Sequence, residues 1–219
     1  MNSASWNKVS YNKLLNFVPA TKKRGLHWTA YAALRQPISK ALCSKVVAMS
    51  KVKLRMLVPD NWAEYKLIRL SALKESPDSF GSTYEKEVEF SDSEWLERLK
   101  TNFKGMSSMP LVAEIDGVLV GLARGVIHHP DEKVMHVYQM WVSPEARGNG
   151  IAMSFLNELK IWALRNQCKS IELAVTTINE TAVSLYTVFG FKAEGVAKEL
   201  RAGSELLTQR MVMVLDHAA

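Results

Sequence analysis

The chain has 219 residues, of which 47% are hydrophobic, and this composition is typical of a globular protein with one well-buried domain. No apolar run approaches the ~20 residues that a transmembrane helix needs, so a membrane partner is not expected. The two cysteines, Cys43 and Cys168, are far apart, which excludes a disulfide framework and favours a reducing, cytoplasmic compartment.

The net charge of +6 is unevenly distributed along the chain. Residues 1–48 contain eight Lys and Arg and no Asp or Glu, which leaves 20 basic and 22 acidic residues for 49–219. The larger segment is therefore slightly acidic and lacks the basic face expected of a nucleic-acid-binding domain. A nucleic-acid partner is not expected, unless residues 1–48 bind it as a basic arm in a salt-dependent manner.

Residues 1–48 form a basic leader without the long apolar core of a secretory signal. The leader could be a disordered arm, an organellar transit peptide or an artefact of gene-start assignment. We favour the artefact, because Met49 and the residues after it read like a natural protein start that runs into a strand. The domain is therefore predicted at 49–219, with no internal repeat and no second domain.

The first half of the domain predicts a helix between strands. A strand is expected over 52–58, followed by a helix that Asp60 caps and Pro77 terminates. Ser91 and Glu94 have capping-box spacing at the start of another helix. Strands then follow at 110–115, 118–127 and 134–142, the first two joined by the turn Asp116-Gly117.

A glycine-rich loop separates the strand ending at Val142 from an amphipathic helix that begins near Ile151. Glycine permits a tight turn and close approach of a ligand, and the first amides of a helix have no partner within it. Such a loop is suited to hold a phosphate or pyrophosphate. Many strand-to-helix turns contain glycine for geometry alone, and Arg147 could be a solvated charge. The loop fits neither a P-loop nor the usual dinucleotide fingerprint.

The last part of the chain predicts another strand and helix, then a terminal hairpin. The strand 170–176 alternates apolar and polar residues, and Asn179 can cap the next helix. Gly190 suits a left-handed helix end, with Phe191 folding back over the last turn. Segments 192–200 and 209–215 can pair around Ala202-Gly203. The mixed order predicts an α/β fold with a mostly antiparallel sheet and a central parallel pair.

Two blocks of this sequence together resemble the GNAT-superfamily N-acetyltransferases. Arg147 to Ala152 is similar to their (Arg/Gln)-x-x-Gly-x-(Gly/Ala) loop. Asn179, Ala182, Leu185, Tyr186, Gly190 and Phe191 are similar to their block Asn-x-x-Ala-x-x-Leu-Tyr-x-x-x-Gly-Phe. The segment from Ala72 to Glu85 looks like the first-helix region of a bacterial subgroup. The resemblance covers roughly residues 53–216.

The resemblance implies a GNAT fold whose central parallel strands splay apart to admit acetyl-CoA as co-substrate, with no metal. The acetyl group would pass to a primary amine by direct attack within a ternary complex. The pantetheine arm would pair with the splayed strand, and a backbone amide near the bulge would polarise the thioester. The implied cofactor-binding residues are Met140, Trp141, Val142, Arg147, Gly148, Asn149, Gly150, Ile151, Ala152, Asn179 and Tyr186.

Two proton transfers need catalytic help in such a reaction. Supplying the neutral form of an amine with a pKa of ~10.4 at pH 7 costs about 4–5 kcal/mol, so a base or a water chain is needed. The departing thiolate benefits from a proton donor. Tyr186 matches the tyrosine acid of the family, although by position alone it is a core residue. Asn179 matches an asparagine that touches the cofactor arm, although it could be a plain helix cap.

The general base is weakly determined by the sequence. We assign Glu85 as the candidate base; Glu87, Tyr138, Gln139 and Glu114 are alternatives. His128 and His129 are expected to be exposed turn residues rather than metal ligands.

A second functional hypothesis is a non-catalytic GNAT domain that senses acyl-CoA. The acceptor could be a small amine or a peptide amine, because acceptor residues lie on variable loops. The sequence also leaves a homodimer open.

Overall fold

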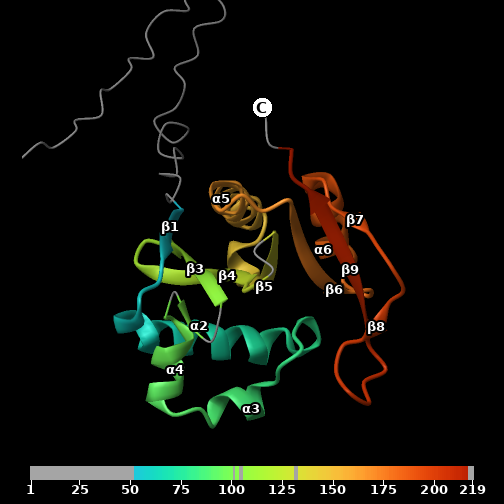
Figure 1. Ribbon diagram of the computed structural model, residues 1–219. Helices are drawn as coiled ribbons and strands as arrows, with labels where there is room; N and C mark the ends of the chain where they lie inside the picture. Colours follow the sequence, from blue (N-terminus) through green and yellow to red (C-terminus); the bar gives the residue numbers. More distant parts are fainter. Residues whose placement is uncertain (1–51, 101, 104–105, 131–132, 217–219) are drawn as a thin grey trace, which may run out of the picture. The chain divides into compact units, whose positions relative to one another are not determined.

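The computed structural model of the protein describes residues 52–100, 102–103, 106–130 and 133–216 (Figure 1). The predicted leader at 1–48 lies outside the described residues, so its three interpretations remain predictions. Within the described part, none of the helices has the length and apolar content needed to cross a membrane.

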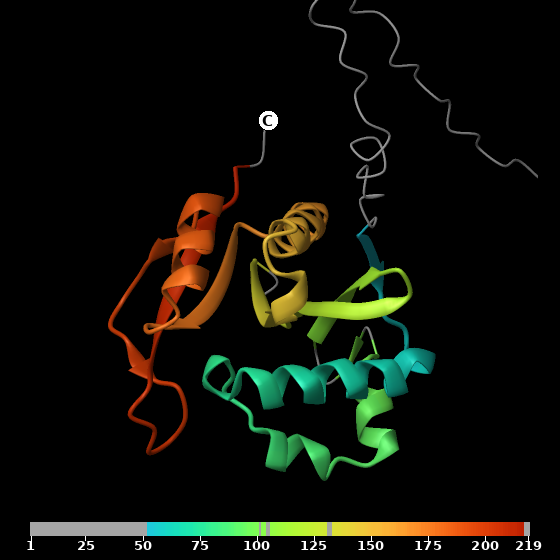
Figure 2. The same cartoon turned by 180° about the vertical axis from the view of Figure 1, so that it is seen from behind.

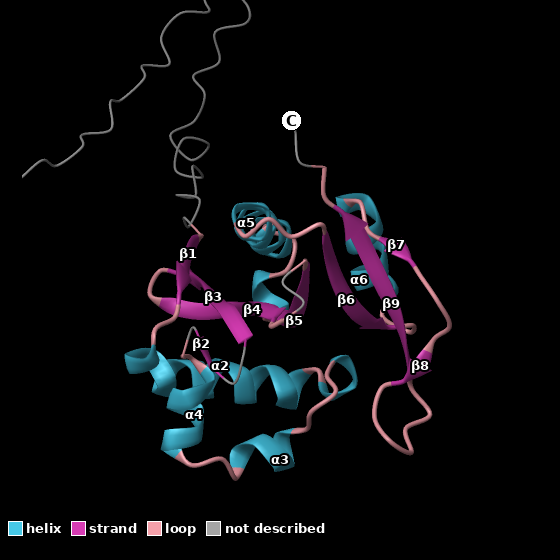
Figure 3. Ribbon diagram, in the orientation of Figure 1, coloured by secondary structure: helices cyan, strands magenta, loops and turns pink. Residues whose placement is uncertain are grey.

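A single mixed sheet runs through the described residues (Figure 3). Its nine strands there follow the order β1-β3-β4-β5-β6-β9-β7, while β2 pairs with β3 and β8 pairs with β9. Only β5 and β6 pair in parallel among these strands, which confirms the predicted fold class. The strands are β1 Lys53–Met56, β2 Asn102–Phe103, β3 Met106–Ile115, β4 Val118–His128, β5 Val134–Val142, β6 Ser170–Thr176, β7 Lys192–Ala193, β8 Lys198–Glu199 and β9 Leu207–Val214.

Helices cover both faces of this sheet. Helices α2, α3 and α4 lie on one face, and α5 and α6 lie on the other (Figures 1 and 2). The α-helices are α2 Trp62–Glu75, α3 Tyr84–Val88, α4 Asp92–Arg98, α5 Ile151–Arg165 and α6 Glu180–Phe189. Three short 3-10 helices, η1 Pro59–Asn61, η2 Pro77–Ser79 and η3 Pro144–Ala146, complete the connections.

Local capping chemistry explains several helix ends. Ser91 and Glu94 form the predicted capping box at the start of α4. Asn179 accepts a hydrogen bond from the Ala182 amide at the start of α6. At the other end of α6, Gly190 has a φ of 114°, and the Phe191 amide returns to the Tyr186 carbonyl. These local signals were readable from the sequence and are confirmed.

Other boundaries differ from the predictions. Asp60 does not cap α2, because residues 59–61 form a 3-10 turn in which Asn61 accepts from the Val58 amide. Helix α3 was not predicted, and β3 begins at Met106 rather than at 110. The predicted terminal hairpin is formed by two short strands, β7 and β8, that both pair with β9.

The parallel pair separates soon after it begins. The β5–β6 ladder contains three residue pairs and ends at His136 opposite Glu172. Beyond this point β5 stays paired with β4, whereas β6 stays paired with β9. The edges of β5 and β6 that face each other therefore diverge, as predicted.

A β-bulge lies in β5 where the strands have diverged. Leu122 pairs with Trp141 and Arg124 pairs with Tyr138, so two residues of β5 oppose one of β4. One of them, Gln139, has a φ of 57°, which is unusual for a residue other than glycine. The Tyr65 hydroxyl from α2 donates to the Gln139 side chain at 2.9 Å and thereby anchors the bulge.

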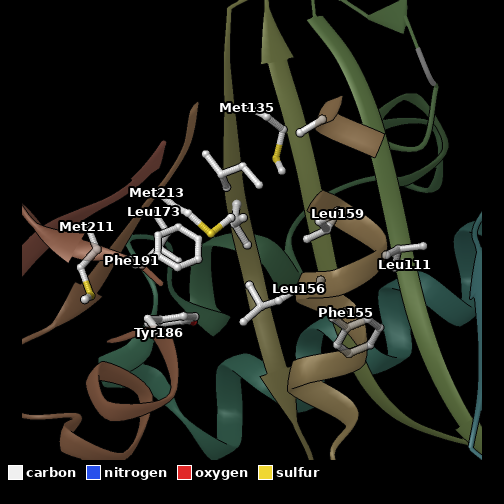
Figure 4. Close-up of a cluster of buried hydrophobic side chains, with 14 of the residues drawn as sticks. Leu111, Met135, Phe155, Leu156, Leu159, Leu173, Tyr186, Phe191, Met211 and Met213 are labelled. Carbon is white, nitrogen blue, oxygen red and sulfur yellow. The ribbon is translucent and has the colours of Figure 1, made fainter. Parts of the chain in front are cut away.

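Two hydrophobic cores flank the sheet. The larger one packs α5 and α6 against it, and Figure 4 shows Tyr186 and Phe191 within this core. The rings of these two residues meet edge to face, with centroids 5.8 Å apart. The smaller core packs α2 and α4 against the opposite face around Tyr65, Trp95 and Leu122. Both cores position the diverging strands between them.

Candidate active site

The glycine loop has the geometry of an anion cradle. Gly148 and Gly150 have φ values of 83° and 72°, and Gly150 is the N-cap of α5. A Cβ atom added at either glycine would meet nothing within 4 Å, so the space above the loop is open. The first amides of α5 have no acceptor within the helix and lie at its positive end. The loop can therefore hold a pyrophosphate.

Arg147 is held by contacts to two other elements. Its Nε donates to the Val142 carbonyl at 3.1 Å, and its Nη2 donates to both carboxylate oxygens of Glu75 at 3.0 and 2.9 Å. Glu75 also accepts from the Trp141 indole at 2.7 Å and from the Ser76 hydroxyl. The end of α2, the end of β5 and the loop are thus joined through one carboxylate.

Tyr186 lies where the two central strands diverge. Its side chain is 8% exposed, and its hydroxyl donates to the Met140 sulfur at 3.4 Å. Burial raises the pKa of Tyr186 to about 12. The phenol therefore stays protonated at physiological pH and can act as a proton donor.

A cleft of about 1010 Å³ connects these features. Seven of the predicted cofactor-binding residues line it: Met140, Trp141, Val142, Arg147, Ala152, Asn179 and Tyr186. The remaining four do not line it. Gly148, Asn149 and Gly150 are exposed in the loop, where the side-chain Nδ2 of Asn149 donates to the Ala146 carbonyl. Ile151 is buried in the larger core, so only its backbone is available to a ligand.

The structure does not bring Glu85 to the cleft. Glu85 is exposed in the first turn of α3 and does not line the cleft. Glu114 does not line it either. Glu87 does line the cleft but is fully buried against Arg69, with Nε to Oε2 at 3.0 Å and Nη2 to Oε1 at 2.8 Å. Burial acts to raise the pKa of Glu87, but the Arg69 and Arg98 guanidiniums outweigh it and lower that pKa. It is therefore a weak base.

Other titratable groups gather on the face of the sheet that borders the cleft. His136 stacks on Tyr138 with ring centroids 6.0 Å apart and meets His128 edge to face at 5.2 Å. Glu172 pairs with His136 in the β5–β6 ladder and is bound by Arg210, whose Nε donates at 2.8 Å. All five residues line the cleft. His128 is half-buried at the end of β4, which differs from the exposed turn position predicted for it, whereas His129 is exposed.

Comparison with known proteins identifies this architecture. Residues 70–191 match the model of the acetyltransferase (GNAT) family, which is more than half of the chain. The chain belongs to the GNAT acetyltransferase family.

One relative of this GNAT chain is an L-2,4-diaminobutyric acid acetyltransferase of Vibrio parahaemolyticus. The two are 30% identical over 80 residues, which cover 36% of this chain and 44% of the relative. The match thus spans less than half the length of that curated relative.

Solved structures share the fold of this GNAT chain at low sequence identity. An acetyltransferase of the GNAT family from Streptococcus pneumoniae superposes with a TM-score of 0.62 at 19% identity, covering 76% of this chain and all of that one. Spermidine N-acetyltransferase from Vibrio cholerae, solved with CoA and spermine, gives 0.60 at 21% identity, covering 75% and 96%. The protein yncA from Salmonella typhimurium, solved with its cofactor acetyl-CoA, gives 0.63 at 17% identity, covering 78% and 97%.

Sequence reasoning missed several residues that line the cleft of this GNAT chain. The missed charged and titratable residues are Arg69, Arg98, Arg124, His136, Glu172 and Arg210. A signal was available for two of them. Arg124 interrupts the apolar strand 118–127, and Arg69 occupies a buried position of the α2 periodicity between Tyr65 and Leu73. Charged residues at such positions are rarely buried without a partner or a ligand.

Proposed function

We propose that this GNAT chain transfers the acetyl group of acetyl-CoA to an amine by direct attack in a ternary complex. The observation that carries the proposal is the position of Tyr186. Its protonated phenol lies against Met140 at the divergence of β5 and β6, in the same cleft that Arg147 and Ala152 line. A proton donor and the two residues that flank the glycines of the loop thus line one cavity.

The cofactor would supply an activated thioester, and the protein would orient it. The loop amides from Gly148 to Ala152 and the Arg147 guanidinium are suited to the pyrophosphate. The diverging edge of β5 offers backbone groups from Met140 to Val142 to the peptide-like pantetheine arm. Asn179 uses its side-chain oxygen as the α6 cap, which leaves its amide nitrogen to donate to the cofactor arm.

The amine must lose a proton before or during attack. Glu85 does not reach the cleft, and the arginine partners of Glu87 and Glu172 hold the pKa of each carboxyl below its ordinary value. We therefore replace Glu85 by His136, working through water, as the proposed proton acceptor. An imidazole nitrogen can accept a proton from an amine through a bridging water.

The acceptor class is supported by two relatives. One acetylates a diamino acid and another is named for spermidine, so both names specify small-molecule amines. A small amine acceptor fits a cleft of about 1010 Å³ that must also admit the acyl arm.

Thiol release measures the proposed reaction directly. Purified protein is mixed with acetyl-CoA and a panel of small amines, and free CoA thiol and acetylated amine are quantified. Amine-dependent thiol release supports the transferase. Tight binding of CoA without release from any amine would support the alternative, a non-catalytic acyl-CoA sensor.

The proton acceptor has its own test. His136→Asn should lower kcat/KM about 10²-fold, because it removes the proposed proton acceptor. Glu85→Gln should leave the rate unchanged. Unchanged kcat/KM in His136→Asn would contradict the assignment of His136.

A further inference from the structure

Three arginines converge on one side of the cleft. Arg69 comes from α2, Arg98 from α4 and Arg124 from β4, and all three line the cavity. Glu87 is the one carboxylate that the described residues place among them, since its Oε1 lies 2.8 Å from the Nη2 of Arg69 and 3.7 Å from that of Arg98. We call these four residues the arginine cluster. Its formal charge is positive, because three guanidiniums face one carboxylate.

Each arginine of the cluster keeps a buried N–H group without a hydrogen-bond partner among the described residues. These groups are Nη1 of Arg69, Nε of Arg98 and Nε of Arg124. The fourth such atom in the described part of the chain is Nε1 of Trp95, whose ring lies 5.7 Å from the Arg98 guanidinium. Buried donors almost always have an acceptor, because leaving one unpaired is costly. The cluster is therefore short of acceptors, and the guanidinium groups that line the cleft can bind an anionic ligand.

The surroundings fix Arg69 and Arg98 in place before a ligand arrives. Arg69 is 2% exposed, is bound by Glu87 through two hydrogen bonds and lies 4.5 Å over the Phe80 ring. Arg98 lies 4.9 Å over the Phe90 ring. Ordered guanidiniums lose little entropy on binding, which favours recognition of a planar or tetrahedral anion.

The cluster lies on the acceptor side of the reaction centre. Arg124 pairs with Tyr138 directly beside the bulge of β5, on the sheet face that α2 and α4 cover. The glycine loop begins beyond the other end of this bulge, after Val142. Arg147, and not the cluster, is the arginine that lies beside this loop. An anion at the cluster would therefore belong to the acceptor rather than to the pyrophosphate.

We propose that the acceptor is a small amine that also carries an acidic group, and that this group binds to the guanidiniums of Arg69, Arg98 and Arg124 that line the cleft. This inference rests on the proposed acetyl transfer and narrows its substrate class. A carboxylate has two coplanar acceptor oxygens and a phosphonate has three acceptor oxygens, so both fit the shared chemistry.

Matched acceptors test the requirement for the acidic group. The kcat/KM of each of three diamino acids (2,4-diaminobutyrate, ornithine and lysine) is compared with that of its carboxamide and of the diamine left when the carboxylate is removed. An aminoalkylphosphonate is measured as well, to show whether the site prefers a phosphonate or a carboxylate. The best acidic acceptor should have a kcat/KM at least 10-fold above that of its matched amide, because charge-assisted hydrogen bonds are about twice as strong as neutral ones. An amide or a diamine that performs as well as the acid would overturn the proposal.

Variants connect the preference to the cluster. Arg124→Gln and Arg98→Gln should each raise the KM for the acid at least 10-fold and leave the KM for the amide within 2-fold. Arg69 is kept, because its removal would also strip Glu87 of its buried partner. Arg165→Gln, at the exposed end of α5 and outside the cleft lining, is the matched control and should change neither KM. An equal effect of Arg124→Gln on acid and amide would contradict the proposal.

A binding measurement separates this inference from the proposed reaction. The acidic amine is titrated calorimetrically into the protein with CoA present, and Kd should weaken at least 10-fold in Arg124→Gln. Failure of thiol release with this binding intact would reject the proposed function but keep the anion site. Acetyl transfer without a binding difference between acid and amide would reject the anion site alone.

Discussion

The Arg147 guanidinium donates to both carboxylate oxygens of Glu75, a residue 72 positions earlier in the chain, at 3.0 and 2.9 Å. Burial acts to raise the pKa of Glu75, but hydrogen bonds from Ser76 and Trp141 and the charge of Arg147 outweigh it, so the pKa lies below its ordinary value. The carboxylate is therefore ionised at neutral pH. It offsets the positive charge that the proposed pyrophosphate site would use.

Removing the negative charge of Glu75 should strengthen CoA binding. Glu75→Gln keeps an acceptor for the Trp141 indole but removes the negative charge beside Arg147. Because exposed ion pairs of this kind are worth up to about 1 kcal/mol, the Kd for CoA should fall about 3- to 5-fold. Calorimetric titration of CoA measures the change. Weaker binding in Glu75→Gln would instead mean that Glu75 orients Arg147 for the ligand.

The anion cradle can be tested at Gly150. Gly150→Glu places a carboxylate above the helix start, where it opposes the phosphates, and should weaken CoA binding at least 100-fold. Gly117→Glu is a matched control, because Gly117 has a φ of 83° and open space around its Cβ position but lies in the β3–β4 turn. Both variants should lose about 1–2 kcal/mol of stability from the left-handed backbone. Normal CoA affinity in folded Gly150→Glu would reject the cradle.

Tyr186→Phe should separate proton donation from binding. The variant loses only the hydroxyl that contacts Met140, so kcat should fall about 10²-fold or more while the Kd for CoA stays within 2-fold. Because the pKa of Tyr186 is about 12, the wild-type rate should show no descending limb from this phenol up to pH 10. Tyr84→Phe, outside the cleft lining, is the control. Unchanged turnover in Tyr186→Phe, with chemistry rate-limiting, would contradict its role.

Features fixed by neighbouring residues were predictable from the sequence. The left-handed end of α6 at Gly190, the Asn179 cap and the Asp116-Gly117 turn depend on interactions within a few residues. The same holds for the glycine loop, whose two positive φ values follow from residue type. These local features place the strands and helices that form the proposed cofactor side of the candidate site.

The proposed acceptor side depends on contacts that the sequence does not encode locally. The bulge at Gln139 is anchored by Tyr65, which is 74 residues away, and no glycine marks its positive φ. Glu87 was one of several acidic residues after the loop, and only the packing of α2 against α3 shows that it is bound to Arg69 instead of facing a substrate. Glu85 and Glu87 both follow the same predicted loop, and helix α3 was not predicted, so the sequence did not show which of the two carboxylates is buried.

The buried pair Arg69–Glu87 should stabilise the fold in a pH-dependent manner. Glu87→Gln leaves the Arg69 charge buried without a counter-charge and should lower the free energy of unfolding by about 3–5 kcal/mol at pH 7. Exposed Glu85, two positions earlier, is the matched control. Glu85→Gln should change the free energy of unfolding by no more than about 0.5 kcal/mol. Urea denaturation followed by circular dichroism measures both.

The pH dependence of this difference follows from the lowered pKa of Glu87. Because the folded-state pKa lies below the unfolded value near 4.5, the unfolded chain binds the proton first as pH falls. The stability gap between wild type and Glu87→Gln should therefore be constant above about pH 5.5. The gap should shrink as pH drops below the pKa of Glu87 in the unfolded chain and then through its lower pKa in the folded protein. A gap that widened towards low pH, or that matched the small effect of Glu85→Gln at pH 7, would show that Arg69 is compensated by another group.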